Sequence, residues 1–463
     1  MHEPSAVENG RIRLDAFVAK RATRADVEAR QRRRLKTLLE FVLRQSRFYS
    51  RHYRDVDRPI TDLGALPPVT KSTLMEHFDD VVTDTAVTRP RVDAFVADAS
   101  NVGRRFLGRY PVWLTSGTTG EPGTFLQDER TLTVADAVSD RWSVPALFAS
   151  GTVGSLFRND VRTAELAVSG GHYAAASGVA MYRREHRFLR DRLRLFSPKR
   201  PLPELVESLD EFQPAILVGY ASVLVELARE QRAGRLNLDP AFVAPSGEPI
   251  SDAEKQELRS AFDCTVREIY GATEFYAIAV ECAHGNLHAN TDWVVLEPVD
   301  EEYRPVDPGE PSDTVLVTNL ANRIQPVVRY DLGDSVTMYE DRCPCGSAFP
   351  VVEVAGRQGD VLHFAAEDGT TVPVFPLAIS SVVEEVPDVR RTQILQTAPR
   401  SLSVRLEVAD DAAERRVWDR VERDLRDFLE RHGVTGVSIE SASEPPNRDA
   451  DSGKFRHVWS AVE

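Results

Sequence analysis

The residues best suited to bind phosphate lie in one short run. It reads Thr115-Ser116-Gly117-Thr118-Thr119-Gly120. Glycine lets the backbone approach a ligand closely, and hydroxyl and backbone N–H groups donate hydrogen bonds to phosphate oxygens. The run is not a Walker loop, because no Gly-Lys-Ser or Gly-Lys-Thr ends it. Loops of this composition are also common as plain turns, so the run alone does not establish a phosphate site.

Five further motifs follow this run along the chain. In order, they are Ser246-Gly247-Glu248-Pro249, Tyr270-Gly271-Ala272-Thr273-Glu274, Arg329-Tyr330-x-x-Gly333-Asp334, Gly356-Arg357 and Gly453-Lys454. Carboxylates such as Glu274 offer hard oxygen ligands for Mg²⁺, and a carboxylate such as Asp334 accepts hydrogen bonds from paired hydroxyls. A fixed ammonium such as Lys454 stabilises negative charge that grows in a transition state. Six motifs in a fixed order are far more specific than any one of them alone.

In this order, the six motifs resemble the adenylate-forming superfamily of acyl-CoA synthetases and adenylation domains. The Gly-Glu-Pro step and the segment Cys343-Pro344-Cys345-Gly346 resemble its phenylacetate–CoA ligase branch. The resemblance runs from about Leu35 to the C-terminus. It implies that ATP activates a carboxylic acid as an acyl-adenylate and that coenzyme A then takes the acyl group. An amine or a carrier-protein thiol is the alternative acceptor, and a non-catalytic nucleotide- or acyl-binding relative is the alternative class.

The resemblance also assigns roles to single residues. Glu274 is expected to hold Mg²⁺, Lys454 to contact the α-phosphate and carboxylate, and Asp334 to bind the ribose. The residues expected to bind the nucleotide or line the acyl pocket are Ser116, Gly117, Thr118, Thr119, Gly120, Ser246, Gly247, Glu248, Pro249, Tyr270, Gly271, Ala272, Thr273, Asp334 and Arg357. His172 is a candidate for the edge of the carboxylate pocket, with an ordinary loop histidine as its alternative. The aromatic candidates Tyr173, Tyr220, Phe242, Phe275 and Tyr276 point to a flat or aromatic acid.

Four positions depart from the family pattern. Glu121 replaces the Lys that often follows the Thr-Gly step, so we expect its side chain to point away from the triphosphate or the loop to engage phosphate less. Asp331 and Leu332 replace an Arg-Thr pair, and Gly359 stands where relatives carry the hinge Asp. A competing interpretation of residues 332–335 as a phosphopantetheine attachment site is rejected, because their flanks have strand patterns rather than those of a small helical bundle.

Three cysteines and a histidine suggest a metal site. Cys282 and His288 are close in sequence, and Cys343 and Cys345 form a second pair. Three thiolates and one imidazole complete a closed tetrahedral Zn²⁺ site, which is structural rather than catalytic. His284 competes with His288 as the fourth ligand, and buried reduced thiols are the alternative. We expect the remaining cysteine, Cys264, to lie in the core.

Apolar periodicity indicates which elements position these residues. Strand patterns over 215–218, 241–244 and 266–270 alternate with helical patterns, which predicts parallel strands with helical crossovers. Residues 287–337 predict a β-rich subdomain. Helices are predicted over 27–51, over 70–78 with Thr70 as the cap, and over 417–429 with Gly433 as the stop. The predicted class is α/β, with a large N-terminal domain of layered α/β subdomains plus the β-rich subdomain (1–356) and a small mobile α+β C-terminal domain (357–463).

Composition limits the partners. The 463 residues are 42% apolar and 28% charged, which excludes global disorder. A net charge of -15 disfavours nucleic acids and anionic membranes. The polar N-terminus, the lack of an apolar run near about 20 residues and the 4 cysteines predict a cytoplasmic protein. The expected partners are a small carboxylic acid, ATP, and CoA, an amine or a carrier protein, in a monomer or homodimer.

Overall fold

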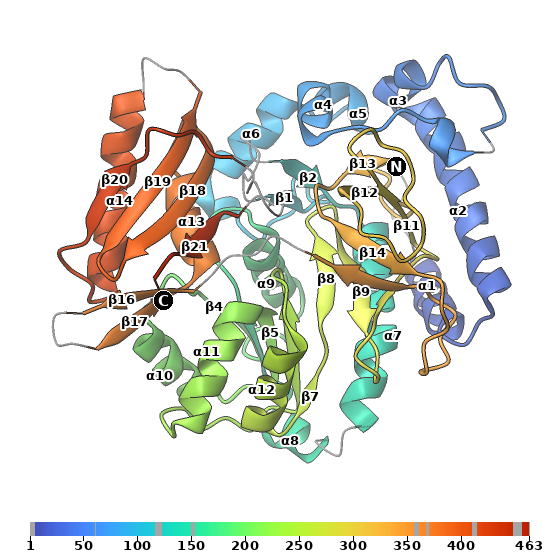
Figure 1. The fold of residues 1–463 in the computed structure, drawn as a ribbon. Coiled ribbons are helices and arrows are strands. Elements are labelled where there is room, and N and C mark those ends of the chain that lie inside the picture. The colour runs from blue at the N-terminus through green and yellow to red at the C-terminus, as the bar shows by residue number, and fades with distance from the viewer. Residues whose placement is uncertain are drawn as a thin grey trace. The chain divides into compact units, whose positions relative to one another are not determined.

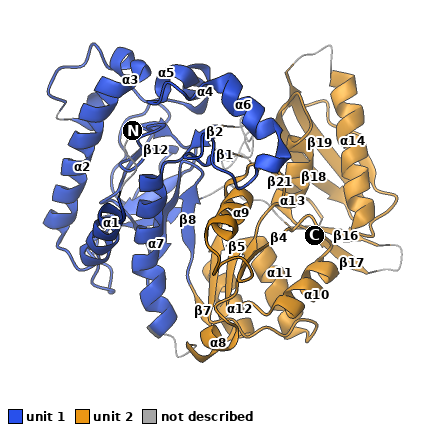
Figure 2. Cartoon of the chain, turned by 180° about the vertical axis from the view of Figure 1, so that it is seen from behind, with its two compact units in different colours: residues 1–114, 124–151, 267–356 blue, residues 115–123, 152–266, 357–463 orange. Residues whose placement is uncertain are grey.

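The computed structural model describes residues 5–60, 62–115, 123–149, 153–355, 361–366, 370–409, 414–447 and 456–462 (Figure 1). The chain divides into two compact units (Figure 2). Unit 1 comprises residues 1–114, 124–151 and 267–356, and unit 2 comprises residues 115–123, 152–266 and 357–463. The chain passes from unit 1 to unit 2 after residue 356, which is the position of the predicted domain boundary. The division into two continuous domains at that point stays a prediction.

The helices of unit 1 lie mostly in its first 150 residues. They are α1 (Ala6–Ala19), α2 (Arg24–Gln45), α3 (Arg47–His52), α4 (Lys71–Glu76), α5 (Phe78–Val81), α6 (Arg89–Ala97) and α7 (Glu129–Ala149), with short 3-10 turns at Leu63–Ala65 and Ala99–Asn101. The helical region predicted over 27–51 is confirmed, but it consists of two helices that are separated at Ser46. Ser46 is extended and its side chain accepts a hydrogen bond from the Tyr49 N–H, so it ends α2 and caps α3. The predicted Thr70 cap is confirmed, because its side chain accepts from the Thr73 N–H.

The strands of unit 1 form three sheets. One is antiparallel in the order β14 (Val336–Tyr339), β15 (Val351–Val354), β10 (Leu287–Ala289), β9 (Phe275–Glu281), β8 (Ile269–Ala272). A second runs β11 (Val294–Val299), β12 (Thr314–Asn319), β13 (Tyr330–Asp331), and β1 (Val112–Leu114) pairs with β2 (Thr124–Leu126). The β-rich character predicted for residues 287–337 is confirmed. Side chains from these strands and from α2 and α7 share one apolar core.

Unit 2 contains the predicted parallel strands. The order is β6 (Phe242–Ser246), β5 (Ile216–Tyr220), β3 (Thr163–Leu166), β4 (Leu193–Phe196), and β7 (Thr265–Val266) pairs with β6. Helix α8 (Val153–Arg158) precedes β3, and the crossover helices are α9 (Ala174–Glu185), α10 (Leu202–Phe212), α11 (Ala221–Arg232) and α12 (Asp252–Phe262). The strand predicted over 266–270 is two strands, because β7 ends at Val266 and β8 begins at Ile269.

The C-terminal part of unit 2 is α+β, as predicted. A β-hairpin of β16 (Leu362–Ala365) and β17 (Thr371–Val374) precedes α13 (Pro376–Glu384). A four-stranded sheet follows in the order β20 (Ser438–Ser441), β19 (Ser401–Val408), β18 (Val389–Ala398), β21 (Val458–Ser460). The helix α14 (Glu414–Arg431) buries the predicted face, and Gly433 with φ +76° follows its end. No helix within the described ranges is long and apolar enough to cross a membrane.

Candidate functional site

The motif 270–274 forms the turn between β8 and β9. The side chain of Gln127 donates to the carbonyl of Thr273 at 2.9 Å, and the side chain of Asn319 donates to the carbonyl of Glu274 at 2.9 Å. Both carbonyls of the turn are therefore held by amides from other segments of unit 1. Gly271 is required by space, because a Cβ there would lie 2.1 Å from the Tyr276 carbonyl oxygen.

Two predicted nucleotide-binding residues meet directly. The Tyr270 hydroxyl donates to Asp334 Oδ2 at 3.0 Å. Tyr270 lies on β8, whereas Asp334 lies in the connection between β13 and β14. Motifs separated by 64 positions in the sequence thus come together in unit 1.

Asp331, which departs from the family pattern, supports this connection. Its Oδ1 accepts from the Thr314 hydroxyl at 2.5 Å and from the Gly333 N–H at 3.0 Å, and its Oδ2 accepts from the Tyr303 hydroxyl at 2.9 Å. A carboxylate that accepts from the N–H two residues later builds an Asx turn, and Gly333 completes it with φ +78°. Asp331 therefore shapes the loop that carries Asp334.

Glu274 is 4% exposed. Burial raises the pKa of its carboxyl, and the nearby charge of Asp334 adds to the rise, whereas a hydrogen bond with Tyr330 and the charge of Lys71 lower the pKa. This buried carboxyl with a cation and a hydroxyl nearby is a hard-oxygen donor that suits Mg²⁺.

Lys71 was not among the predicted site residues. It is the first residue of α4, and the strand-like segment just before it is tied to the 329–334 motif. The Val69 N–H donates to the Arg329 carbonyl and the Asp331 N–H donates to the Val69 carbonyl, both at 2.9 Å. These bonds bring Lys71 into electrostatic range of Glu274. The only sequence signal was the Thr70 cap next to it.

The motif 246–249 lies in unit 2 beside Tyr220. Gly247 has φ +74°, and a Cβ there would approach the Tyr220 ring to 3.1 Å. Glu248 Oε2 accepts from the Ser222 N–H at 2.8 Å, and burial raises the pKa of Glu248 to about 7. Burial raises the pKa of Glu165, on β3, to about 8, and the charges of both carboxyls add to the raised pKa of Tyr220. The tyrosine predicted to line an acyl pocket therefore lies among partly or fully protonated acids.

Three other pocket candidates are buried in the structure. His172 is completely buried in the turn before α9. Phe242 is 3% exposed and Phe275 is 1% exposed, and Phe275 is part of the apolar core of unit 1. Phe275 is therefore a core residue, in contrast to Tyr220 and Tyr173, which keep partial exposure.

Several predicted site residues lie outside the described ranges. These are Ser116, Gly117, Thr118, Thr119, Gly120, Arg357 and Lys454, together with the departures Glu121 and Gly359. The described residues next to the Ser/Thr/Gly run are joined, because the Thr115 N–H donates to the Gly123 carbonyl at 2.9 Å and the Gly123 N–H donates to the Thr115 hydroxyl at 2.8 Å.

A buried amide joins the two described ends that flank Lys454. Gln393, on β18, is 2% exposed. Its Nε2 donates to the carbonyls of Asn447 and Arg456, each at 2.8 Å, and its Oε1 accepts from the Asn447 N–H at 3.0 Å. One side chain thus binds the chain on both sides of residues 448–455.

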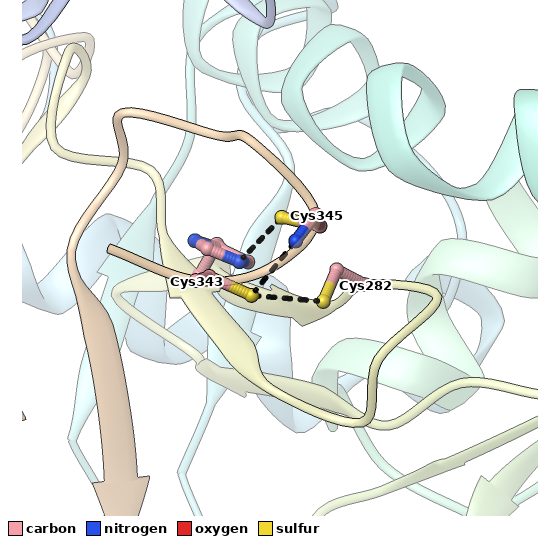
Figure 3. Close-up of side chains that lie close together, drawn as sticks. Cys282, Cys343 and Cys345 are labelled. Atoms are coloured by element: carbon pink, nitrogen blue, oxygen red, sulfur yellow. Dashed lines mark hydrogen bonds between the residues drawn. The ribbon is translucent and has the colours of Figure 1, made fainter. Parts of the chain in front are cut away.

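The predicted metal ligands form a cluster in unit 1 (Figure 3). The ligand atoms of Cys282, His288, Cys343 and Cys345 all lie within 4.8 Å of one another. Cys282 Sγ is 3.8 Å from Cys343 Sγ, and Cys345 Sγ is 3.2 Å from His288 Nε2. Three sulfurs and one imidazole nitrogen match the donor set of a structural Zn²⁺ site.

The surroundings of the cluster decide between the two histidines. His288 Nδ1 lies 2.8 Å from the Phe349 carbonyl oxygen, which orients Nε2 toward the sulfurs, and its ring stacks on Trp142. His284 instead donates its backbone N–H to Cys282 Sγ at 3.3 Å. The structure therefore places His288, and not His284, among the four donors.

Comparisons with known proteins agree with this fold. No protein-family model matches the sequence. The crystal structure of 2-hydroxyisobutyryl-CoA ligase in complex with 2-HIB-AMP and CoA is similar with a TM-score of 0.57 at 20% identity, covering 100% of this chain and 94% of that chain. The same ligase in the postadenylation state with 2-HIB-AMP gives a TM-score of 0.54 at 19% identity, with 99% and 93% covered.

One curated protein is similar in sequence. Protein CapK of Staphylococcus aureus is 25% identical over 226 residues, which are 48% of this chain and 48% of CapK. The match therefore spans about half the length of that relative. The structural likeness covers nearly the whole chain and confirms the predicted superfamily resemblance at the level of the fold. This chain has the fold of the adenylate-forming ligases.

Proposed function

We propose that this chain uses ATP to activate a carboxylic acid as an acyl-adenylate and then transfers the acyl group to coenzyme A. The observation that carries the proposal is the hydrogen bond between Tyr270 and Asp334 beside Glu274, from motifs far apart in the sequence. The solved structures with this fold support it, because 2-hydroxyisobutyryl-CoA ligase was crystallised with 2-HIB-AMP and CoA.

The proposed first step joins the acid to AMP. A carboxylate oxygen of the acid attacks the α-phosphorus of ATP, the bond to pyrophosphate breaks, and negative charge grows on the α-phosphate oxygens. Asp334 accepts hydrogen bonds from the ribose, Glu274 would hold Mg²⁺, and Lys454 stabilises the growing charge. Mg²⁺ supplies charge neutralisation at the phosphates. In the second step the thiolate of CoA attacks the acyl carbon and AMP leaves.

ATP–pyrophosphate exchange tests the proposal. Purified protein is measured against a panel of aryl and alkyl acids, and we expect exchange with a subset, led by flat or aromatic acids such as those of the phenylacetate–CoA ligase branch. Product analysis with CoA, amines and carrier protein then identifies the acceptor. Measurable ATP binding without exchange for any acid would instead favour a non-catalytic nucleotide-binding relative.

Lys454→Ala tests the assigned division of labour. We expect it to abolish adenylation but to leave acyl transfer from supplied acyl-AMP largely intact, because only the first step builds charge around an attacked α-phosphorus, whereas the second step breaks the acyl C–O bond and releases AMP. Equal loss of both steps would contradict the role of Lys454. The proposed adenylating activity would still stand after such a result if the unaltered protein catalyses ATP–pyrophosphate exchange.

We also propose that Cys282, His288, Cys343 and Cys345 hold a structural Zn²⁺ ion. The supporting observation is the closed S₃N donor set, in which the second nitrogen of His288 already lies against a backbone carbonyl. Elemental analysis should find about one zinc per chain. Cys345→Ser should lower that ratio and the unfolding temperature, whereas Cys264→Ser, which removes the thiol outside the cluster, should leave the ratio unchanged. A zinc content near zero in the unaltered protein would remove this proposal.

A further inference from the structure

Two half-buried arginines of unit 1 lie within electrostatic range of the same carboxylate, Asp128, and neither has a direct carboxylate partner among the described residues. Arg130 is in the first turn of α7, and Arg323 is in the connection between β12 and β13. Among the described residues, no carboxylate oxygen lies within ion-pair distance of either guanidinium, and Arg130 Nε is buried without a hydrogen bond. Within the described ranges, the Arg323 guanidinium makes one long hydrogen bond, 3.5 Å, to the Thr37 carbonyl.

Other buried arginines of the same unit show what this pair lacks. Arg141 binds both oxygens of Asp292, with a shortest distance of 2.7 Å. Arg34 is ion-paired with Asp292 at 3.3 Å and with Asp15. The buried guanidiniums of Arg141 and Arg34 are thus neutralised by carboxylates, which offsets the desolvation cost of a buried charge.

The carboxylate nearest to the pair is occupied by other donors. Asp128 precedes α7, and its Oδ1 accepts from the N–H and the hydroxyl of Thr131 in the first turn of that helix, while its Oδ2 accepts from the Arg323 backbone N–H at 2.8 Å. Burial lowers the pKa of Arg323 to about 10, and the charge of Arg130 is the next cause. Asp128 therefore anchors the backbone of Arg323 but, among the described contacts, forms no ion pair with either guanidinium.

Aromatic rings hold the two guanidiniums in place. The Arg130 guanidinium carbon lies 5.2 Å from the centre of the Trp293 ring, and that of Arg323 lies 4.7 Å from the centre of the Phe41 ring. Cation–π contacts restrict the side chains without neutralising their charge. Pre-oriented guanidiniums with free donors are the usual recognition element for phosphate oxygens.

We propose that Arg130 and Arg323 form a binding site for an oxyanion of the phosphate class. The site is formed by α7 and the β12–β13 connection rather than by the residues assigned above to the nucleotide. It does not depend on the proposed ligase activity. The bound group is free phosphate or pyrophosphate, or the phosphate of a larger molecule.

Isothermal titration of the full-length protein with inorganic phosphate at constant ionic strength tests the site. We expect saturable binding that weakens at least tenfold in the double variant Arg130→Gln/Arg323→Gln. The matched control is Arg11→Gln/Arg33→Gln, which removes two exposed arginines and the same net charge from α1 and α2, and it should bind as the unaltered protein does. No binding by the unaltered protein, or equal binding by all three, would overturn the proposal.

Additional titrations identify which phosphate-containing molecule binds, and additional variants separate a loss of binding from a loss of folding. The titration is repeated with pyrophosphate and with ATP, and competition against bound phosphate shows which molecule the arginine pair prefers. Arg130→Lys/Arg323→Lys keeps both charges and should retain most of the affinity. If the double Gln variant does not fold, Arg130→Gln alone is measured, and unchanged phosphate affinity in that variant would likewise count against the site.

Discussion

The hydrogen bond between Tyr270 and Asp334 tests the site at the scale of single residues. Hydrogen bonds to charged groups contribute about 1.5–3 kcal/mol. We expect Tyr270→Phe to lower kcat/KM for ATP by roughly 10- to 100-fold in pyrophosphate exchange, because Asp334 loses its oriented partner. Tyr339→Phe is the matched control. The Tyr339 hydroxyl donates to Glu353 Oε2 at 2.8 Å, and neither residue belongs to a predicted nucleotide motif. Equal losses in both variants would argue that the Tyr270 bond has no special role.

Some site residues follow from sequence and others need the fold. Glu274 and Asp334 stand in ordered motifs, so their types and spacing predict them. Lys71 does not, because its approach to Glu274 depends on the bridge between Val69 and Tyr330, which no local pattern encodes. Sequence alone also left two histidines open for the metal cluster. In the structure, the pairing of His288 with Val351 brings β10 beside the strand that follows Cys345, so that His288 lies close to the three cysteines.

At the scale of secondary-structure elements, the close approach of β8 and β9 leaves no room for a side chain at Gly271. A Cβ there would lie 2.1 Å from a backbone oxygen, which cannot yield as a flexible side chain would. We expect Gly271→Ala to destabilise the protein by about 2 kcal/mol or more and to impair ATP binding. Gly10→Ala is the control with the opposite sign, because Gly10 lies within α1 with nothing within 4 Å of its Cβ position. That change should stabilise the helix by up to about 1 kcal/mol in chemical denaturation.

The hydrogen bonds of Gln393 to Asn447 and Arg456 give a second prediction at the scale of elements. Gln393→Leu keeps a side chain of similar size but removes the three hydrogen bonds to residues 447 and 456. If Lys454 has the proposed role, kcat of adenylation should fall while KM for ATP and the rate of acyl transfer from supplied acyl-AMP change little. A matched loss of both half-reactions would indicate a purely structural role for Gln393.

The elements themselves were predictable where periodicity is strong. The α14 helix and the alternating β19 strand follow directly from their apolar spacing. The break at Ser46 was missed because the apolar pattern continues across it, and a capping serine interrupts the backbone without interrupting that pattern. The split between β7 and β8 was missed for a related reason, since short apolar runs do not show where one strand ends and another begins.

At the scale of the whole molecule, buried acids make stability depend on pH. Burial raises the pKa of Glu165 from 4.5 to about 8 and that of Glu248 to about 7. The native protein therefore holds protons that the unfolded chain has already released, so stability is highest near pH 4.5 or below for these groups and falls as pH rises toward 8. The slope is at most about 1.4 kcal/mol per pH unit for each carboxyl.

Glu165→Gln checks this dependence. The amide cannot ionise, so we expect the variant to gain stability at pH 8 and to show a flatter decline between pH 5 and 8 in denaturant titrations. Glu407→Gln replaces a carboxyl of β19 whose side chain is 42% exposed, and it should leave the profile unchanged. Parallel profiles for the unaltered protein and Glu165→Gln would show that Glu165 is charged in the native state.

The division of the chain into two units could not be predicted from local sequence patterns. Each unit is assembled from three separate segments, so neither corresponds to a continuous stretch with its own composition. The α/β class could be predicted, because alternation of strand and helix patterns is a local property. Which segments share a core depends instead on long-range packing, such as that of α13 with α14 in unit 2.

The hydrogen bond of Gln393 to the Arg456 carbonyl also limits how far the chain just before Arg456 can move from β18. Arg456, whose carbonyl Gln393 binds, lies two residues after Lys454, and two residues of extended chain span about 7 Å. Arg456 in turn precedes β21, which pairs with β18. If Lys454 has the proposed role, the region that its ammonium can reach is therefore set mainly by the position of the sheet to which β18 and β21 belong.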